Sequence, residues 1–497
     1  MTDRAISGRA AATAVGVRLA PRRRARGYRG AAVALLAVLA GATAVLVRQG
    51  FVYQPPTVVW GGVVLLWLGL LPAWAFYFRG LSDDIPLLPL HGIFYAAAYA
   101  WPVFWESPGF GNPGGRWLED ALALTIAGLA VLYFGYYVVG AALFRHVKSV
   151  HLPRPASVLA ARGMAWCFVF IQMLFPVLPP AVKALPSLGQ FVEVVGTFGL
   201  ALLLAHSFAR ELPAREIVLL YGLVVPALLV RYTASGAVAP VFTFLIFLAL
   251  IYVYVQKKVP PLAVVLVGAL LVVFLQGGKA EYRQLTWGGA YEDAGTFEKA
   301  VLFARCSMQQ LTGQGSAAVL ETSTNRLNQL WVFATVMQET PAQVPYQGGR
   351  TYLPLLTKWI PRALWPGKPE EITGNQFGRL YGLLATNDET TSLNLPWLAE
   401  FYMNFGLAGV LSGMFLVGLF FRLLRQMLCT GRAGPQDYAM ALAVALRLYW
   451  AESNLSLMVG NIFLGLVAIF LVFSLLRRPR QRRRVARAVV GGTARSW

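Results

Sequence analysis

Long apolar runs recur along most of this chain and leave few alternatives to a membrane fold. A helix needs about 20 apolar residues to cross the hydrocarbon core of a bilayer. On that criterion we predict spans at 30–47, 57–78, 86–105, 121–144, 157–178, 187–208, 217–230, 236–255, 259–276, 406–424, 438–450 and 455–474. Apolar residues make up 57% of the chain and charged residues 13%. The sequence therefore predicts an all-α polytopic membrane protein with about 12 transmembrane helices, a count that the short runs 217–230 and 438–450 could change by one or two.

The distribution of Lys and Arg predicts the orientation of the spans, because basic residues near spans stay on the cytoplasmic side. Alternate connections are basic, and both ends of the chain are rich in arginine. We therefore expect a cytoplasmic (inner) membrane protein with both termini inside. Its predicted parts are a basic tail (1–29), helices one to nine (30–276), a large extracytoplasmic segment (277–405), helices ten to twelve (406–476) and a second basic tail (477–497).

The net charge of +21 does not indicate a nucleic-acid partner. Most of the basic residues flank spans, where orientation and attraction to anionic headgroups account for them. The three cysteines, Cys167, Cys306 and Cys429, are predicted in a span, outside and inside respectively, and no metal-ligand spacing is present. We expect no disulfide, no metal and no cofactor.

The polar segment 277–405 holds 11 of the 22 acidic residues, and it is where we expect chemistry. Its first part, 295–338, predicts two amphipathic helices broken near 313–315. In the second helix, Leu327, Leu330, Trp331, Ala334 and Met337 recur at helical spacing and form one apolar face. The six prolines between 340 and 369 exclude long helices there.

Aromatic and basic residues are dense in the second half of this segment. Aromatic rings stack on sugar faces, and arginine clamps phosphate with two hydrogen bonds. Such a cluster therefore suits a phosphorylated sugar, although a loop lying at the lipid interface is an equal alternative for any single residue. The candidates are Arg326, Arg350, Tyr352, Trp359, Arg362, Trp365, Lys368, Trp397 and Tyr402.

Charged residues near the outer ends of predicted spans form a second group of candidates, because a charge at membrane depth is costly and usually faces a cavity. The topology predicts that they converge. The alternative is a set of structural ion pairs, such as Arg447 with Glu452. This group consists of Glu193, Arg231, Lys279, Arg283, Glu400, Asn404, Arg447 and Glu452.

Four runs in and after the polar segment resemble a known family. The runs are YQGGRTY (346–352), IPRALWPGKP (360–369), GNQFGRLYG (374–382) and PWLAEFYMNFGLAG (396–409). With many spans and one large loop between helices nine and ten, they resemble the bacterial polysaccharide repeat-unit polymerases, the O-antigen polymerase-like (Wzy) family. The resemblance implies a GT-C-like membrane glycosyltransferase.

The resemblance further implies an inverting, metal-independent reaction on polyprenyl-diphosphate-linked oligosaccharides at the outer face of the membrane. A chain-length regulator and a flippase would be its partners. Such a reaction needs cations for the departing diphosphate and a base for the acceptor hydroxyl. We expect Arg326, Arg350 and Arg362, with Lys279, Arg283 or Lys368, to bind diphosphate. Glu400 is the predicted base, with Glu452 and Glu193 as the next candidates.

Two other functions stay open. One is an O-antigen-ligase-like transferase. The lipopolysaccharide O-antigen ligases use a histidine on the outer face, and the absence of one here counts against this function. The four histidines of the chain, His91, His146, His151 and His206, all map to the cytoplasmic side. The other is a non-enzymatic flippase or transporter of lipid-linked sugars. Transporters usually carry broken helices with polar residues at mid-membrane, whereas the charges here are predicted at one face.

Overall fold

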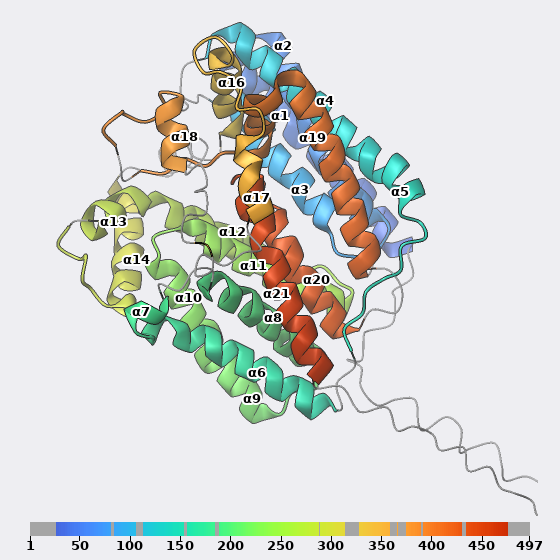
Figure 1. The fold of residues 1–497 in the computed structure, drawn as a ribbon, viewed down its shortest axis with the longest axis vertical. Coiled ribbons are helices and arrows are strands. Elements are labelled where there is room, and N and C mark those ends of the chain that lie inside the picture. Colours follow the sequence, from blue (N-terminus) through green and yellow to red (C-terminus); the bar gives the residue numbers. More distant parts are fainter. Residues whose placement is uncertain are drawn as a thin grey trace, which may run out of the picture.

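The computed structural model describes residues 26–80, 84–105, 113–153, 157–183, 188–287, 289–313, 328–357, 365, 374–388, 391–429 and 434–475. Within these ranges the chain forms helices and connecting loops, with no strand, and the helices pack into one bundle (Figure 1). The all-α, polytopic prediction is confirmed. The predicted residues Arg326, Trp359, Arg362 and Lys368, and most of both basic tails, lie outside the described residues.

The first nine predicted spans all fall on helices. Three of the spans contain a π-helical turn of five residues, at 96–100, 135–139 and 220–224, and two end in a short 3₁₀ turn, at 101–104 and 175–177. These spans therefore consist of two or three consecutive helical pieces. The elements are α1 (Arg26–Tyr53), α2 (Pro56–Phe78), α3 (Leu87–Tyr95) with η1 (Ala96–Ala100) and η2 (Trp101–Phe104), α4 (Gly115–Phe134) with η3 (Gly135–Val139) and α5 (Gly140–Leu143), α6 (Val158–Leu174) with η4 (Phe175–Val177), α7 (Pro180–Lys183), α8 (Leu188–Phe208), α9 (Ala214–Leu219) with η5 (Leu220–Val224) and α10 (Val225–Ala234), α11 (Val238–Gln256) and α12 (Leu262–Gly277).

The remaining elements belong to the polar segment and the C-terminal part of the chain. They are α13 (Lys279–Thr286), α14 (Thr296–Gly313), α16 (Gln329–Glu339), η6 (Arg350–Tyr352), α17 (Leu353–Thr357), α18 (Gly374–Leu380), α19 (Trp397–Cys429), α20 (Pro435–Leu448) and α21 (Leu455–Leu475). Among the described residues nine helices are long and apolar enough to cross a membrane, or ten if α12 and α13, which are bent by 50°, form one span.

The eleventh predicted run is not a lipid-facing span. It forms α20, which has 14 residues and is therefore shorter than the roughly 20 that a bilayer requires. Almost every residue from Pro435 to Leu448 is buried against other helices. The seventh run, by contrast, is longer than predicted, since α9, η5 and α10 together form a span of 21 residues, Ala214–Ala234.

The polar segment does contain the two helices predicted before its prolines, but the second has no exposed polar face. Every residue of α16 from Gln329 to Met337 is buried, and α16 packs between α4 and α19. After it, the proline-rich part forms only the short helices η6 and α17 within the described residues, as the prolines predict.

Helix α19 folds back on itself at its ninth and tenth residues. Phe405 and Gly406 leave helical geometry, with φ of −142° and 61°. A Cβ atom built on Gly413 would meet the ring of Phe401 at 2.7 Å, although twelve residues of straight helix would separate them by about 18 Å. The segment Trp397–Asn404 therefore lies beside the rest of α19, as a hairpin.

This hairpin packs the end of the polar segment against the bundle. Leu398, like Val410 and Met414, packs on Gly128 near the middle of α4. Residues Trp397 to Asn404 are almost all buried. Within the segment 277–405, α16 and the first part of α19 therefore pack among the bundle helices. Hydropathy did not indicate this for 397–404, because Glu400 and Asn404 bring the average of an otherwise apolar stretch close to neutral.

The reversal at Gly406 predicts a specific sensitivity to substitution. Its φ of 61° and ψ of −145° belong to a region that is essentially restricted to glycine. A Cβ there would also lie 2.9 Å from the Tyr346 hydroxyl. We expect Gly406→Ala to destabilise the fold by about 3 kcal/mol, measured by thermal unfolding in detergent.

Gly382→Ala is the matched control for this substitution. Gly382 also has a positive φ of 64°, but a methyl group added at that position would have no neighbour within 4 Å. The substitution should cost about 1 kcal/mol, from backbone strain alone. Equal effects of the two substitutions would show that neither the backbone conformation of Gly406 nor the approach of an added methyl group to Tyr346 contributes an extra cost.

Candidate functional site

Two of the charged candidates, Glu193 and Arg447, line one cavity, which we call the charged cavity, and a third, Arg231, lies behind it. It has a volume of about 270 Å³ and lies between α6, α8, α10, α11 and α20. Its polar lining includes Gln172, Glu193, Tyr232, Thr243 and Arg447, and its apolar wall includes Leu200, Phe244 and Phe247. A volume just below the usual 300–1,000 Å³ of ligand pockets suits a headgroup or one or two sugar rings.

An ion pair crosses the charged cavity. Arg447, in the last turn of α20, places Nη2 2.8 Å from Oε2 of Glu193, near the start of α8. The side chains keep 32% and 47% of their surface exposed, so both remain accessible to a ligand. An ion pair of this kind was the alternative for these charges, but its acid is Glu193. Glu452, the acid suggested from the sequence, accepts hydrogen bonds from Gln329 and Trp450 instead.

Arg231 stands behind the same cavity. Its Nη1 donates to the carbonyl oxygen of Gln172 at 3.2 Å, and Gln172 itself lines the cavity. The helices approach closely here, since a Cβ on Gly196 of α8 would collide with the Gln172 side chain. The sequence predicted that all eight residues of this group converge. Glu193 and Arg447 line this cavity and Arg231 lies behind it, whereas the other five are not among its lining residues.

Glu400 and Asn404 form a second polar centre, the Glu400–Asn404 junction, inside the bundle. Glu400 is fully buried, and its Oε2 accepts a hydrogen bond of 2.7 Å from the backbone N–H of Leu455, which begins α21. Asn404 accepts from the N–H of Gly349 at 2.8 Å and donates to Thr351 and to the Glu400 carbonyl oxygen. These contacts tie the hairpin to the loop around 349–351 and to α21.

The aromatic candidates lie around this junction rather than in an open groove. Tyr352 packs against the rings of Phe401 and Phe405, and burial raises the pKa of its phenol well above the usual value. Tyr402 contacts Tyr346 and Phe333, and Trp397 is fully buried. Among the described aromatic and basic candidates of this cluster, Arg350, beside Tyr352 in η6, and Trp365 are exposed.

The connection between α20 and α21 joins the two centres. Tyr449 hydrogen-bonds through its hydroxyl to Thr243 of the cavity wall at 3.0 Å. Two residues later, the carbonyl oxygen of Ala451 accepts from the N–H of Trp397, and Glu452 accepts from Gln329 of α16 and from Trp450. The connection between α20 and α21 therefore contacts both the wall of the charged cavity and the buried hairpin.

Lys279 and Arg283 lie outside both centres. They belong to α13, which packs with α12 and α14 around a separate apolar cluster that includes Tyr282 and Phe303. The guanidinium of Arg283 stacks over the Trp287 ring at 4.5 Å. The Tyr282 hydroxyl donates to the carbonyl oxygen of Ala234, so α13 begins at the end of the bundle where Arg231 lies.

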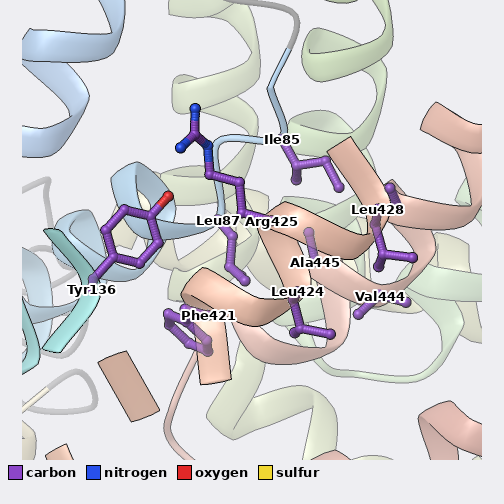
Figure 2. A pocket seen from close by; sticks show the side chains of 10 residues that line it. Ile85, Leu87, Tyr136, Phe421, Leu424, Arg425, Leu428, Val444 and Ala445 are labelled. Carbon is purple, nitrogen blue, oxygen red and sulfur yellow. The ribbon is translucent and has the colours of Figure 1, made fainter. Parts of the chain in front are cut away.

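A second cavity lies between α3, α19 and α20 and is too small for a ligand. Figure 2 shows Tyr136 and Arg425 among the apolar side chains that line it, and its volume is about 10 Å³, room for one water at most. Arg425 pairs there with Asp84 at 2.6 Å. This pair resembles the one between Arg447 and Glu193 in length and exposure.

The sequence analysis missed four of the cavity's polar residues, Gln172, Thr197, Tyr232 and Thr243. Gln172 carried a usable signal, because it is a polar residue in the apolar run FVFIQMLF near the end of a span. Tyr232 and Thr243 are common in spans, and their positions depend on how α10 and α11 pack. Only the packing of helices could identify them.

These features define the protein as a multi-pass helical membrane protein with a charged cavity at one end of its bundle. Over residues 136–481 the sequence matches a family described as Domain of unknown function (DUF8712). Because the match covers more than half of the chain and includes both polar centres, the protein belongs to this family. No curated protein and no solved structure matches it.

Proposed function

We propose that the protein polymerises polyprenyl-diphosphate-linked oligosaccharide repeat units at the outer face of the cytoplasmic membrane. The observation that supports this function is the charged cavity, where Arg447 and Glu193 are accessible and Arg231 lies behind Gln172. Two cations beside a carboxylate, within reach of the bilayer, suit an anionic lipid-linked sugar. The resemblance to repeat-unit polymerases in the runs 346–352 and 396–409 supports the same substrate class.

In the proposed reaction the acceptor hydroxyl oxygen attacks the anomeric carbon of the donor glycan. The new glycosidic bond forms as the bond from that carbon to the diphosphate oxygen breaks, and the diphosphate leaves with the electron pair. Arg447 and Arg231 stabilise this negative charge, and a carboxylate takes the acceptor proton. A cavity of about 270 Å³ holds the reacting groups, while the polyprenyl chains stay in lipid.

Glu193 is the carboxylate that the geometry favours as the base. Nearly half of its side-chain surface is exposed, in the cavity that holds Arg447. Glu400, the base predicted from sequence, is fully buried and bonded to the start of α21, so an acceptor would have to displace packed helices to reach it. Binding of diphosphate to Arg447 would release Glu193 for proton transfer.

A flippase or transporter of lipid-linked sugars is the second candidate. The observation in its favour is the pair of interrupted helices, the α19 hairpin and the bent α12–α13 pair, because broken helices are typical of transporter sites. Under this function the charged cavity would bind the same headgroup without cleaving it.

One experiment separates the two functions. The purified protein, in liposomes, is given synthetic polyprenyl-diphosphate repeat units without nucleotide sugar and in the presence of a metal chelator. A polymerase yields a ladder of lengthening glycans. If the lipid-linked units change leaflet and keep their length, the protein is a transporter and not a polymerase. A ladder that forms only after a nucleotide sugar is added would refute both functions.

A further inference from the structure

Helix α14 has three distinct faces, and the first is packed against the protein. Its inward residues, which include Leu302, Phe303 and Cys306, are buried against α10, α12 and α13. Figure 1 shows α13 and α14 together at one side of the bundle. This face accounts for the position of α14 but uses only part of its apolar surface.

The second face is apolar and exposed. Phe297, Val301, Ala304, Met308 and Leu311 follow one another at intervals of four, three, four and three residues, which places them in one line along a helix. Phe297 is 71% exposed and Met308 54%. Single exposed apolar residues are ordinary, but a line along the whole helix indicates contact with something apolar.

The third face is polar and borders the second. Glu298, Arg305, Gln309 and Thr312 are exposed, and at about 100° per residue they lie roughly a quarter turn from the exposed apolar line. Going around the helix, protein contact is followed by exposed apolar surface and then by polar surface. That order is typical of a helix lying in a membrane interface.

Helix α14 packs against a helix with a largely exposed apolar surface. This helix is α12, in which Leu266, Val267 and Leu270 are exposed. The neighbouring Trp287 is 61% exposed beneath the Arg283 guanidinium, and tryptophan with arginine is common at the headgroup level. Helix α14 therefore lies beside a helix that is apolar enough to cross a membrane together with α13.

We propose that α14 lies in the membrane interface, with Phe297, Val301, Ala304, Met308 and Leu311 among the lipid acyl chains and Glu298, Arg305 and Gln309 toward water. Lipid is favoured over a second protein because α14 packs against the candidate span α12 and its apolar line has a polar border along its length. The inference does not depend on the proposed enzymatic function. It gives α14 the role of a surface anchor beside α10, the helix that carries Arg231.

The test uses nitroxide labels on the full-length protein in phosphatidylcholine–phosphatidylglycerol liposomes. In a background without the three native cysteines, Ala304→Cys and Met308→Cys report on the apolar line, and Arg305→Cys and Gln309→Cys are matched controls on the polar face of the same helix. Collision with oxygen, which concentrates in lipid, is compared with collision with a water-soluble nickel chelate. All four positions are exposed, so the labels should be tolerated.

We expect oxygen collisions to exceed nickel collisions several-fold at 304 and 308, and the ratio to reverse at 305 and 309. Nickel access at 304 and 308 equal to that at the controls would overturn the proposal, because the line would then face water. Low access of both reagents at 304 and 308 would also overturn it, in favour of a covering protein surface.

Discussion

Arg447→Ala is expected to reduce glycan polymerisation about 10³-fold, the usual loss when a cation that stabilises a departing phosphate is removed. Arg447 is the exposed guanidinium of the charged cavity, and its partner Glu193 is the proposed base. Arg447→Lys should retain part of the rate, since lysine keeps the charge but loses the two-bond clamp. Initial rates of ladder formation in liposomes measure both effects.

Arg425→Ala is the control for losing an ion pair as such. Arg425 pairs with Asp84 at 2.6 Å, with 28% and 30% of the side chains exposed, and the adjoining cavity holds only about 10 Å³. Its rate should stay within about threefold of wild type, because a partly exposed pair contributes little to stability. If Arg425→Ala and Arg447→Ala reduced the polymerisation rate equally, the loss would be due to impaired folding. Arg447 would then have no specific role in the reaction.

Glu193→Gln completes this comparison. It preserves the shape of the side chain and removes the proton acceptor, so we expect a loss of about 10²- to 10⁴-fold, the usual contribution of a general base. Binding of the lipid-linked donor should change little. A variant with wild-type polymerisation would leave Glu193 as a partner of Arg447 without a part in proton transfer.

Glu400→Ala should have its largest effect on stability. The carboxylate is fully buried and accepts the N–H of Leu455 at the beginning of α21. Removing it leaves a buried donor without an acceptor and a small void, at a combined cost of about 3 kcal/mol. The unfolding midpoint in detergent should fall by several degrees, and activity should fall with the amount of folded protein.

Glu400→Gln distinguishes this structural role from a catalytic one. The glutamine side-chain oxygen can still accept the Leu455 N–H, so both the unfolding midpoint and the rate should remain near those of wild type. If instead Glu400→Gln abolished polymerisation without changing the unfolding midpoint, Glu400 would be the base that its sequence position first indicated.

The spans were predictable because hydropathy is a local property. The run 57–78, for example, needs no knowledge of its neighbours to be read as a helix of membrane length, and it forms α2 (Pro56–Phe78). The run 438–450 is misleading, because its apolar character comes from burial in protein. A helix of 14 residues that other helices surround has the same composition as a short span facing lipid.

The site was predictable only in part, for the same reason. Charges at the outer ends of helices had to avoid lipid, and this led to Glu193, Arg231 and Arg447. Their pairing depended on where α20 ended, which no local pattern indicated. The stretch 397–404 contains Glu400 and Asn404, and its burial depends on acceptors and donors as distant as Leu455 and Gly349.

The α19 hairpin also constrains how the chain can be assembled during synthesis. Trp397 and Glu400 enter the membrane before their partners Ala451 and Leu455 have been made, since these follow about 50 residues later. Until α21 is inserted, a buried carboxylate has no helix start to bind, which is costly in lipid. The α19 hairpin should therefore complete its packing only after α21 has been made. Chains that stop between α19 and α21 should be degraded by membrane quality control.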